Sequence, residues 1–172
     1  MQSLDLNELF EKILDHIFGL LKRIDRGAIL LVDPRSGKIT RVISRAKDEA
    51  KHAARPYSRT IVNKVLKEGK AVMMSNTIRE DKEERSESME IMKIKSVMCV
   101  PLMSKSKIRG AIYVDSISKP YGFRKEDLSL LLALSSPAAI AMENATLYSN
   151  LESLVAERTK VLMETQERLS ES

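Results

Sequence analysis

The chain has 172 residues, which is the length of one ordinary domain with a short extension. Hydrophobic residues make up 43% of it and charged residues 31%, a balance that excludes an intrinsically disordered chain. The richest apolar stretch, Leu128 to Met142, is interrupted by serines and by Pro137, so we expect no membrane span. Acidic residues stand where a secretory signal would be basic, which predicts a cytoplasmic protein.

The formal net charge of +5 is unevenly distributed along the chain. Between Pro34 and Lys70 there are eleven basic and three acidic residues, a local charge of +8. Aromatic residues are only 4% of the chain and tryptophan is absent, so the stacking surfaces of single-strand binders are missing. We interpret the segment as a solvated basic surface, and nucleic-acid binding is the weaker alternative.

The residues that could carry chemistry are few. Cys99 is the single cysteine, and with only His16 and His52 beside it the chain lacks a ligand set for zinc. No pattern places a nucleophile beside a base or builds a glycine-rich phosphate loop. We therefore expect neither an enzyme nor a metal protein.

The first half of the chain predicts a helix followed by a hairpin and a second, short helix. Apolar residues at spacings of three and four predict an amphipathic helix from about Asp5 to Leu21. Strands are expected at 28–32 and 38–44, joined by turn residues. Ser58 is then a good N-cap and Gly69 a good C-terminal residue for a short helix. A small strand at 71–74 and a charged loop at 75–88 follow.

The second half predicts another hairpin and a long final helix. Strands are expected at 97–103 and 108–116, after a helical turn near Ile94, and Gly110 predicts a bulge or a close backbone approach. The last helix should run from about Lys125 to Leu169, or about 65–70 Å at 1.5 Å per residue. That exceeds the roughly 40 Å width of a globule of this size, so its end should project.

The two halves of this last helix have different patterns. The first half is apolar on nearly every side, which predicts burial, whereas from Glu143 onward a narrow apolar stripe lies among charges. We infer a parallel dimer with a short coiled coil, and a frayed tail is the alternative. The expected interface consists of residues from the first and last helices: Leu6, Leu9, Ile13, Ile17, Leu147, Leu151, Leu154 and Val161.

Several sequence strings in this order resemble the GAF domain, a small-molecule sensing module of signalling proteins. They are GAILLVDPRSGKI, SRTIVNKVLKEGKAVMMSN, SVMCVPL, GAIYVDS and FRKEDLSLLLALSSPAAIAMENATLY, within Leu4 to Tyr148. The segment LESLVAERTKVL from Leu151 resembles the helical connectors that join such modules to outputs such as a histidine kinase, a cyclase or a transcription activator. The resemblance predicts a GAF domain at 1–148 and, at 149–172, a coiled-coil connector to an output domain of the same polypeptide.

The resemblance implies an α+β fold whose central antiparallel sheet has helices on both faces. The long first and last helices would cover one face, and short helices and loops would close a ligand pocket on the other. Exposed amides at the start of the Ser58 helix would favour an anionic group there, unless Ser58 merely caps and Arg59 faces solvent. The pocket candidates are Arg55, Tyr57, Ser58, Arg59, Asn76, Thr77, Met98, Tyr113 and Asp115.

The resemblance leaves the cofactor unassigned. The residues after Asn63 and Lys64 do not follow the pattern of cyclic-nucleotide-binding members, and Cys99 lies in an apolar strand unsuited to bilin attachment. Neither His16 nor His52 favours haem, and the methionine sulfoxide reductases built on this fold need several cysteines. The rival to a sensor is a ligand-free dimerisation or docking module, whose pocket is filled by flexible methionines: Met73, Met74, Met92 and Met98.

Overall fold

The computed structural model describes residues 6–47, 56–75, 94, 96–117 and 122–171. The predicted charged loop and the helical turn before Ile94 lie almost entirely outside these residues. The described elements are α1 (Leu6–Leu20), β1 (Arg26–Val32), β2 (Ile39–Ala46), α2 (Arg59–Glu68), β3 (Val72–Ser75), β4 (Ser96–Ser104), β5 (Lys107–Ser116) and α4 (Lys125–Glu171). The predicted order of elements is confirmed, and their ends differ by one or two residues.

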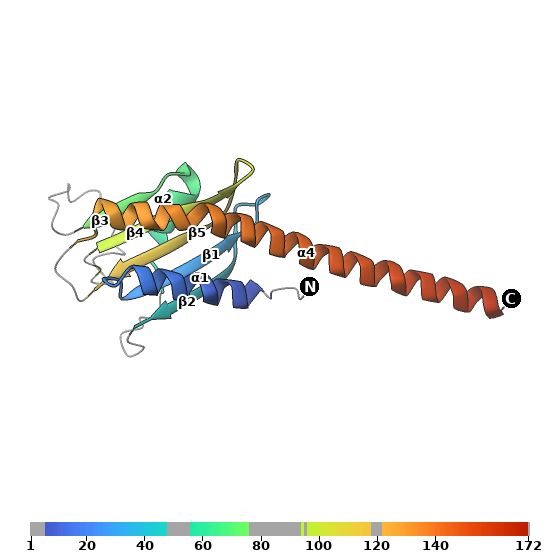
Figure 1. Cartoon of the computed structure of the whole chain (residues 1–172). Helices are drawn as coiled ribbons and strands as arrows, with labels where there is room; N and C mark the ends of the chain where they lie inside the picture. The colour runs from blue at the N-terminus through green and yellow to red at the C-terminus, as the bar shows by residue number, and fades with distance from the viewer. Residues whose placement is uncertain (1–5, 48–55, 76–93, 95, 118–121, 172) are drawn as a thin grey trace.

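The five strands form one antiparallel sheet in the order β2-β1-β5-β4-β3. Both predicted hairpins are present, β1 with β2 and β4 with β5, and β5 pairs with β1 to join them. Helices α1 and α4 lie side by side on one face of the sheet, and α2 covers the other (Figure 1). The predicted fold class is confirmed.

Each hairpin contains a register shift. Leu31 pairs with Arg41 but Val32 pairs with Ile39, so Thr40 is the extra residue of β2. In the other hairpin Leu102 pairs with Gly110 and Met103 pairs with Ile108, so Arg109 is the extra residue of β5. Gly110 also lies close to the backbone of β1: a Cβ on Gly110 would be 2.0 Å from the carbonyl oxygen of Leu30. The expectation of a bulge or close approach at Gly110 is confirmed.

Helix α2 begins and ends where its local sequence predicts. Ser58 is extended, and its hydroxyl accepts a hydrogen bond from the Ile61 N–H at 3.5 Å. Gly69 has a φ of 67°, and its N–H donates to the carbonyl of Val65 at 2.8 Å. Only a residue without a Cβ takes this left-handed conformation without strain, which explains the sharp end of the helix.

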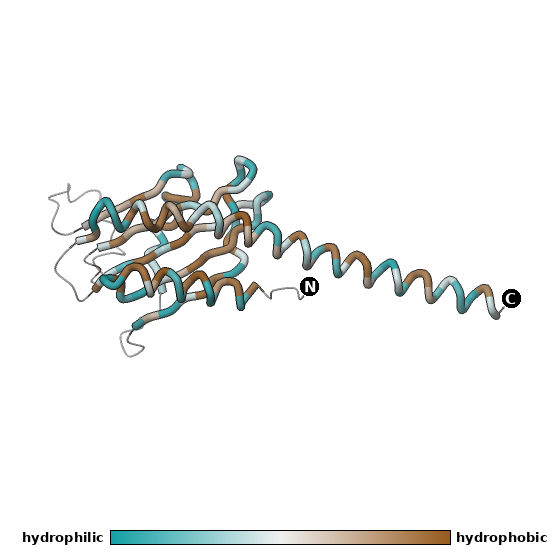
Figure 2. Tube along the Cα trace, in the orientation of Figure 1, coloured by the Kyte–Doolittle hydropathy of each residue, from teal (hydrophilic) through white to brown (hydrophobic). Residues whose placement is uncertain are grey.

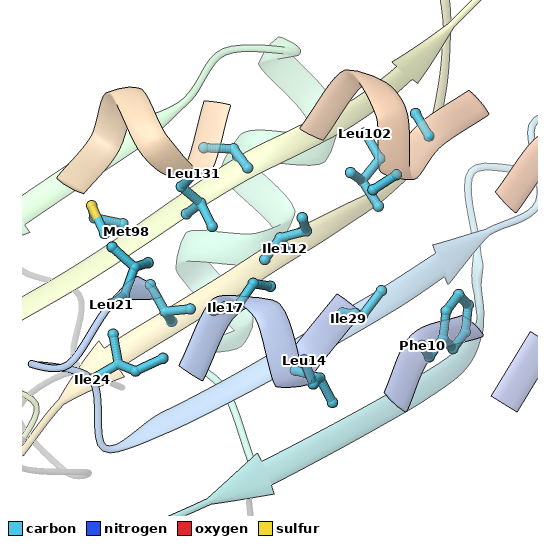
Figure 3. Packing of buried hydrophobic residues seen from close by; sticks show 14 of the residues in the cluster. Phe10, Leu14, Ile17, Leu21, Ile24, Ile29, Met98, Leu102, Ile112 and Leu131 are labelled. Carbon is cyan, nitrogen blue, oxygen red and sulfur yellow. The ribbon is translucent and has the colours of Figure 1, made fainter. Parts of the chain in front are cut away.

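The larger hydrophobic core lies between the sheet and the two long helices. Figure 3 shows Leu14 and Ile17 from α1, Leu131 from α4 and Ile112 from β5 pointing into this layer. Ile17 is completely buried there, since it follows Phe10 and Leu14 on the inner stripe of α1. Its predicted place in the dimer interface is therefore wrong, because no surface of Ile17 remains for a partner.

Helix α4 is continuous for 47 residues and passes through Pro137. Figure 1 shows it running along the sheet and then projecting beyond it, and Figure 2 shows apolar positions recurring along the projecting part. By length and composition α4 is also the one helix of the described residues that could cross a membrane. The serines and Pro137 lie inside the helix without ending it. Burial of Leu131, Ala139 and Met142 gives a sheet-packing reason for its apolar character.

Candidate functional site

A cluster of three polar side chains is buried on the face of the sheet that α2 covers. The Arg26 Nε donates to Asp115 Oδ1 at 2.9 Å, and a terminal guanidinium nitrogen donates to Oδ2 at 2.5 Å. The Tyr113 hydroxyl donates to the same Oδ2 at 2.6 Å. We call Arg26, Tyr113 and Asp115 the Arg26 cluster.

The strand register brings these three residues together. Arg26 at the start of β1 lies directly opposite Asp115 near the end of β5. Tyr113 is two residues before Asp115, and residues two apart in a strand point to the same face. Arg26 is 1% exposed and Asp115 is 0% exposed, so the pair is shielded from water. Burial makes the pairing obligatory, because an isolated charge in this environment would be strongly destabilising.

Burial and mutual attraction act in opposite directions on the cluster. Burial disfavours the charge of Arg26, but the hydrogen bonds to Asp115 outweigh it and raise the pKa of the guanidinium. Burial raises the pKa of Asp115, and the hydrogen bonds from Arg26 and Tyr113 oppose this shift. Burial raises the pKa of Tyr113 well above its usual value, and the neighbouring carboxylate of Asp115 adds to the shift. The hydroxyl of Tyr113 therefore remains a donor.

Two further candidates from the sequence lie beside this cluster. The Tyr57 ring meets the Tyr113 ring edge-on, with 6.3 Å between centroids. Ser58 is completely buried where it caps α2, whereas the Arg59 side chain is exposed. The structure therefore brings Tyr57, Ser58, Tyr113 and Asp115 to one face of the sheet.

The remaining candidates do not join this group. Met98 pairs with Val114, so it points to the opposite face and is buried among the residues under α1 and α4. Met98 and Tyr113 were both expected to line the pocket, but they point to opposite faces of the sheet, because Cys99 is the residue opposite Tyr113. Arg55, Asn76 and Thr77 lie outside the described residues.

Arg26 is not among the residues predicted from the sequence, although it is the largest fully buried side chain among the described residues. A charged residue next to a glycine, just before an apolar run, carries no local sign of burial. The one signal was its spacing, since Arg26 shares a strand face with Ala28 and Leu30.

The reactive side chains considered for cofactors are placed as follows. Cys99 is fully buried in the core beneath α2, and this burial raises the pKa of its thiol, which is therefore inert. His16 is exposed on α1, and His52 lies outside the described residues. Within the part of the chain that the structure describes, no three His, Cys, Asp or Glu side chains gather as metal ligands.

Comparison with protein families decides the identity of the fold. The model of the GAF domain family matches residues 3–143, which is most of the chain. The chain belongs to the GAF domain family. GAF domains are regulatory sensor modules, and the family resemblance drawn from the sequence is confirmed. A comparison with curated proteins found no match.

Solved GAF domains share the fold at low sequence identity. The GAF domain of a two-component sensor histidine kinase from Bacillus halodurans has a TM-score of 0.63 and 21% identity, covering 86% of this chain and 99% of that one. The GAF domain of an Acinetobacter phosphoenolpyruvate-protein phosphotransferase has a TM-score of 0.66 and 21% identity, with 87% and 89% covered. A GAF/HD domain protein from Geobacter sulfurreducens has a TM-score of 0.63 and 16% identity, with 86% and 99% covered. At these identities the likeness establishes the fold of this GAF domain.

Proposed function

We propose that this GAF domain is the sensor module of a cytoplasmic signal-transduction protein. In this proposal it binds a small molecule on the α2 face of the sheet. It relays the binding event through a dimeric α4 to an output domain such as a histidine kinase, a cyclase or a transcription activator. The observation that carries the proposal is the unbroken course of α4 from the buried core to the exposed rod.

Helix α4 is held firmly along the sheet before it projects. Leu131, Ala139 and Met142 are buried, and α4 packs chiefly on β4, with further contacts to α1 and β5. A displacement of these strands is therefore expected to move the helix as a body, because close-packed interiors transmit strain. Residues 149–172 then act as the connector that carries this movement away from the domain.

The projecting half of α4 offers a surface for a second copy of the chain. Leu147, Leu151, Leu154 and Val161 follow one another at spacings of four, three and seven, which places them on one helix face. Leu154 is 47% exposed and Val161 is 56% exposed in the single chain. An isolated amphipathic helix in water is only marginally stable, so a parallel partner helix is the arrangement that this face favours.

The body of the domain offers a continuation of the same surface. A shallow apolar groove of about 190 Å³ lies between α1 and α4, lined by Ile13, Leu134, Pro137 and Ala141 among others. Leu6 and Leu9 are half-buried on the same helix as Ile13. We include Leu6, Leu9 and Ile13 in the proposed interface, whereas Ile17 belongs to the core.

The dimer is tested by placing charges on the proposed seam. We expect the double variant Leu154→Glu and Val161→Glu to remain folded but become monomeric. Each side chain is about half exposed in the single chain, and burying the exposed half in the dimer contributes about 1 kcal/mol. The two side chains of both copies together contribute about 4 kcal/mol. The dissociation constant should therefore rise at least about a thousandfold.

The matched control adds the same charge on the outer side of the rod. Ser153→Glu with Thr159→Glu changes the net charge equally and should leave the dimer intact. Sedimentation equilibrium measures the mass of both variants. A seam variant that sediments as the parent dimer would refute the proposed contact.

The proposed ligand site lies beside the Arg26 cluster. Because Arg26 and Asp115 satisfy one another, a ligand is expected to meet Tyr57 and the amides at the start of α2 instead. We expect a compound from a metabolite panel to raise the unfolding free energy by about 2.7 kcal/mol at a hundredfold excess over Kd, and so to raise the melting temperature. Tyr57→Ala should abolish that response, and Tyr148→Ala on exposed α4 should preserve it. The absence of any response across the panel would favour the rival function.

The rival function is a ligand-free dimerisation or docking module. It is favoured by Met74, which is buried with Cys99 and Tyr113 beneath α2 and so occupies part of this face. The broader version, in which four methionines fill the pocket, needs correction. Met73 and Met98 contribute to the core under α1 and α4, and Met92 lies outside the described residues.

A further inference from the structure

A second cavity lies where α4 leaves the body of the domain, on the face opposite α2. Its volume is about 420 Å³, within the range of small-molecule sites. Its walls are the β1–β2 turn, the start of the β4–β5 turn and the stretch of α4 between Met142 and Asn150. Figure 1 shows the tips of both hairpins beside α4 at this point. We call it the neck cavity.

Both β-bulges of the sheet supply a side chain to the neck cavity. Thr40 is the extra residue of the first hairpin and Arg109 that of the second, and each lines the cavity. The bulge changes the direction of Arg109, because Ala111 and Tyr113 on the same strand face α2 whereas Arg109 contacts Glu143 of α4. Bulges recur beside binding sites, where they redirect a side chain.

The cavity holds an excess of positive charge at the Arg109 end. A terminal nitrogen of Arg109 and the Nζ of Lys105 lie 3.5 and 3.2 Å from the same oxygen, Glu143 Oε1. The second oxygen of Glu143 accepts a hydrogen bond from Ser104. Two cations thus share one carboxylate, and the buried Nε of Arg109 has no hydrogen-bond partner. The side chain of Arg109 is 20% exposed and that of Lys105 is 74% exposed, so both cations can meet an anion that enters the cavity.

The rest of the cavity is apolar, with an acid at its far end. Leu31, Met142 and Leu147 contribute apolar surface, and Leu147 is shared with the proposed dimer face. Asp33 is engaged by its own turn, since its carboxylate accepts from the Arg35 N–H at 3.0 Å and the Ser36 hydroxyl at 3.1 Å. The carboxylate of Asp33 would repel a second negative charge at that end.

We propose that the neck cavity binds an organic monoanion, a carboxylate with a short apolar chain. The carboxylate pairs with the guanidinium of Arg109 and with Lys105, and the chain lies against Leu31 and Met142. The carboxylate of Asp33 disfavours a dicarboxylate by repelling its second negative charge. Arg109 and Lys105 disfavour an alkylammonium, because they repel a cation. The site is separate from the α2 face, so it stands whether or not that face takes a ligand.

The probe for this site is sodium hexanoate, added to the intact chain at millimolar concentrations. The readout is the NMR signal of the Arg109 Nε–H, assigned by its loss in Arg109→Met. We expect this signal to shift saturably with hexanoate, and to respond far less to adipate and to hexylammonium. Calorimetry on the same samples gives the affinity.

The variants separate a built site from adsorption to a basic surface. Arg109→Met should weaken hexanoate at least about tenfold, since it removes charge-assisted hydrogen bonds. Lys105→Met changes an exposed side chain and should weaken the binding of hexanoate several-fold without disturbing the fold. Arg124→Met, at the residue before α4 begins and outside the cavity lining, is the matched control and should leave the affinity unchanged.

Three results would overturn the proposal. The first is an Arg109 signal that moves neither in the parent chain nor in the Leu154→Glu, Val161→Glu variant, in which no partner helix is expected to cover the cavity. The second is equal binding of hexanoate and hexylammonium. The third is an affinity that Arg109→Met and Lys105→Met leave unchanged.

Discussion

Substitutions of the buried pair Arg26 and Asp115 test whether the α2 face of the sheet is shielded from water. We expect Asp115→Leu to leave a guanidinium that is 1% exposed without its counter-ion, and Arg26→Met to leave the carboxylate in the same state. Removing one partner of a buried pair costs about 3–5 kcal/mol of unfolding free energy. For a chain of this length that lowers the melting temperature by about 10 °C or more.

The double variant separates pairing from packing. Replacing both residues removes both charges, so the loss should be smaller than the sum of the two single losses by about 2 kcal/mol or more. The Tyr113 hydroxyl then lacks its acceptor, and adding Tyr113→Phe should recover part of the remaining loss. Urea unfolding followed by circular dichroism measures each free energy.

A contrary result would have a definite meaning. If each single variant lost less than about 1 kcal/mol, the pair would behave as a hydrated, screened ion pair. The Arg26 cluster would then border open water, and the burial argument would be refuted. Additive losses in the double variant would likewise contradict direct coupling between Arg26 and Asp115.

Three further predictions follow from the same structure. Gly110→Ala should cost about 3 kcal/mol or more in urea unfolding because its Cβ would strike the Leu30 carbonyl, whereas Gly19→Ala, with nothing within 4 Å, should stabilise α1 by up to about 1 kcal/mol. Ser58→Ala should cost about 1 kcal/mol by removing the cap of α2, and equal melting temperatures would contradict that role. Burial raises the pKa of Cys99, so the folded thiol stays protonated while the unfolded thiol ionises above about pH 8.5. Unfolding free energy should therefore fall with rising pH by up to about 1.4 kcal/mol per unit, and Cys99→Ala should remove that slope.

The features that sequence predicts well here are those set by near neighbours. The cap at Ser58 and the left-handed Gly69 are decided within one or two turns of helix, and α2 has both. The long α4 follows from a helical period sustained over many turns. Even the bulge at Gly110 is marked locally, by a glycine inside an apolar strand.

The features that escape sequence analysis are those set by strand register. Met98 and Cys99 are adjacent apolar residues, and only the pairing of Cys99 with Tyr113 decides which of them faces α2. A shift of one residue would exchange them. The burial of Arg26 is equally hard to predict, because its partner Asp115 is 89 residues away and no local pattern marks Arg26 as buried. Part of the candidate site therefore could not be read from the sequence.

Strand β5 connects the two sites considered for ligands. Its end carries Tyr113 and Asp115 in the Arg26 cluster, and its beginning carries Arg109 in the neck cavity. It pairs with β1 and β4 on either side, so it cannot shift without moving both hairpins. The salt bridge from Arg109 to Glu143 then joins β5 to α4 at the neck cavity. A displacement of β5 caused at the α2 face would therefore reach the rod through Arg109, and a monoanion in the neck cavity would act on the same contact.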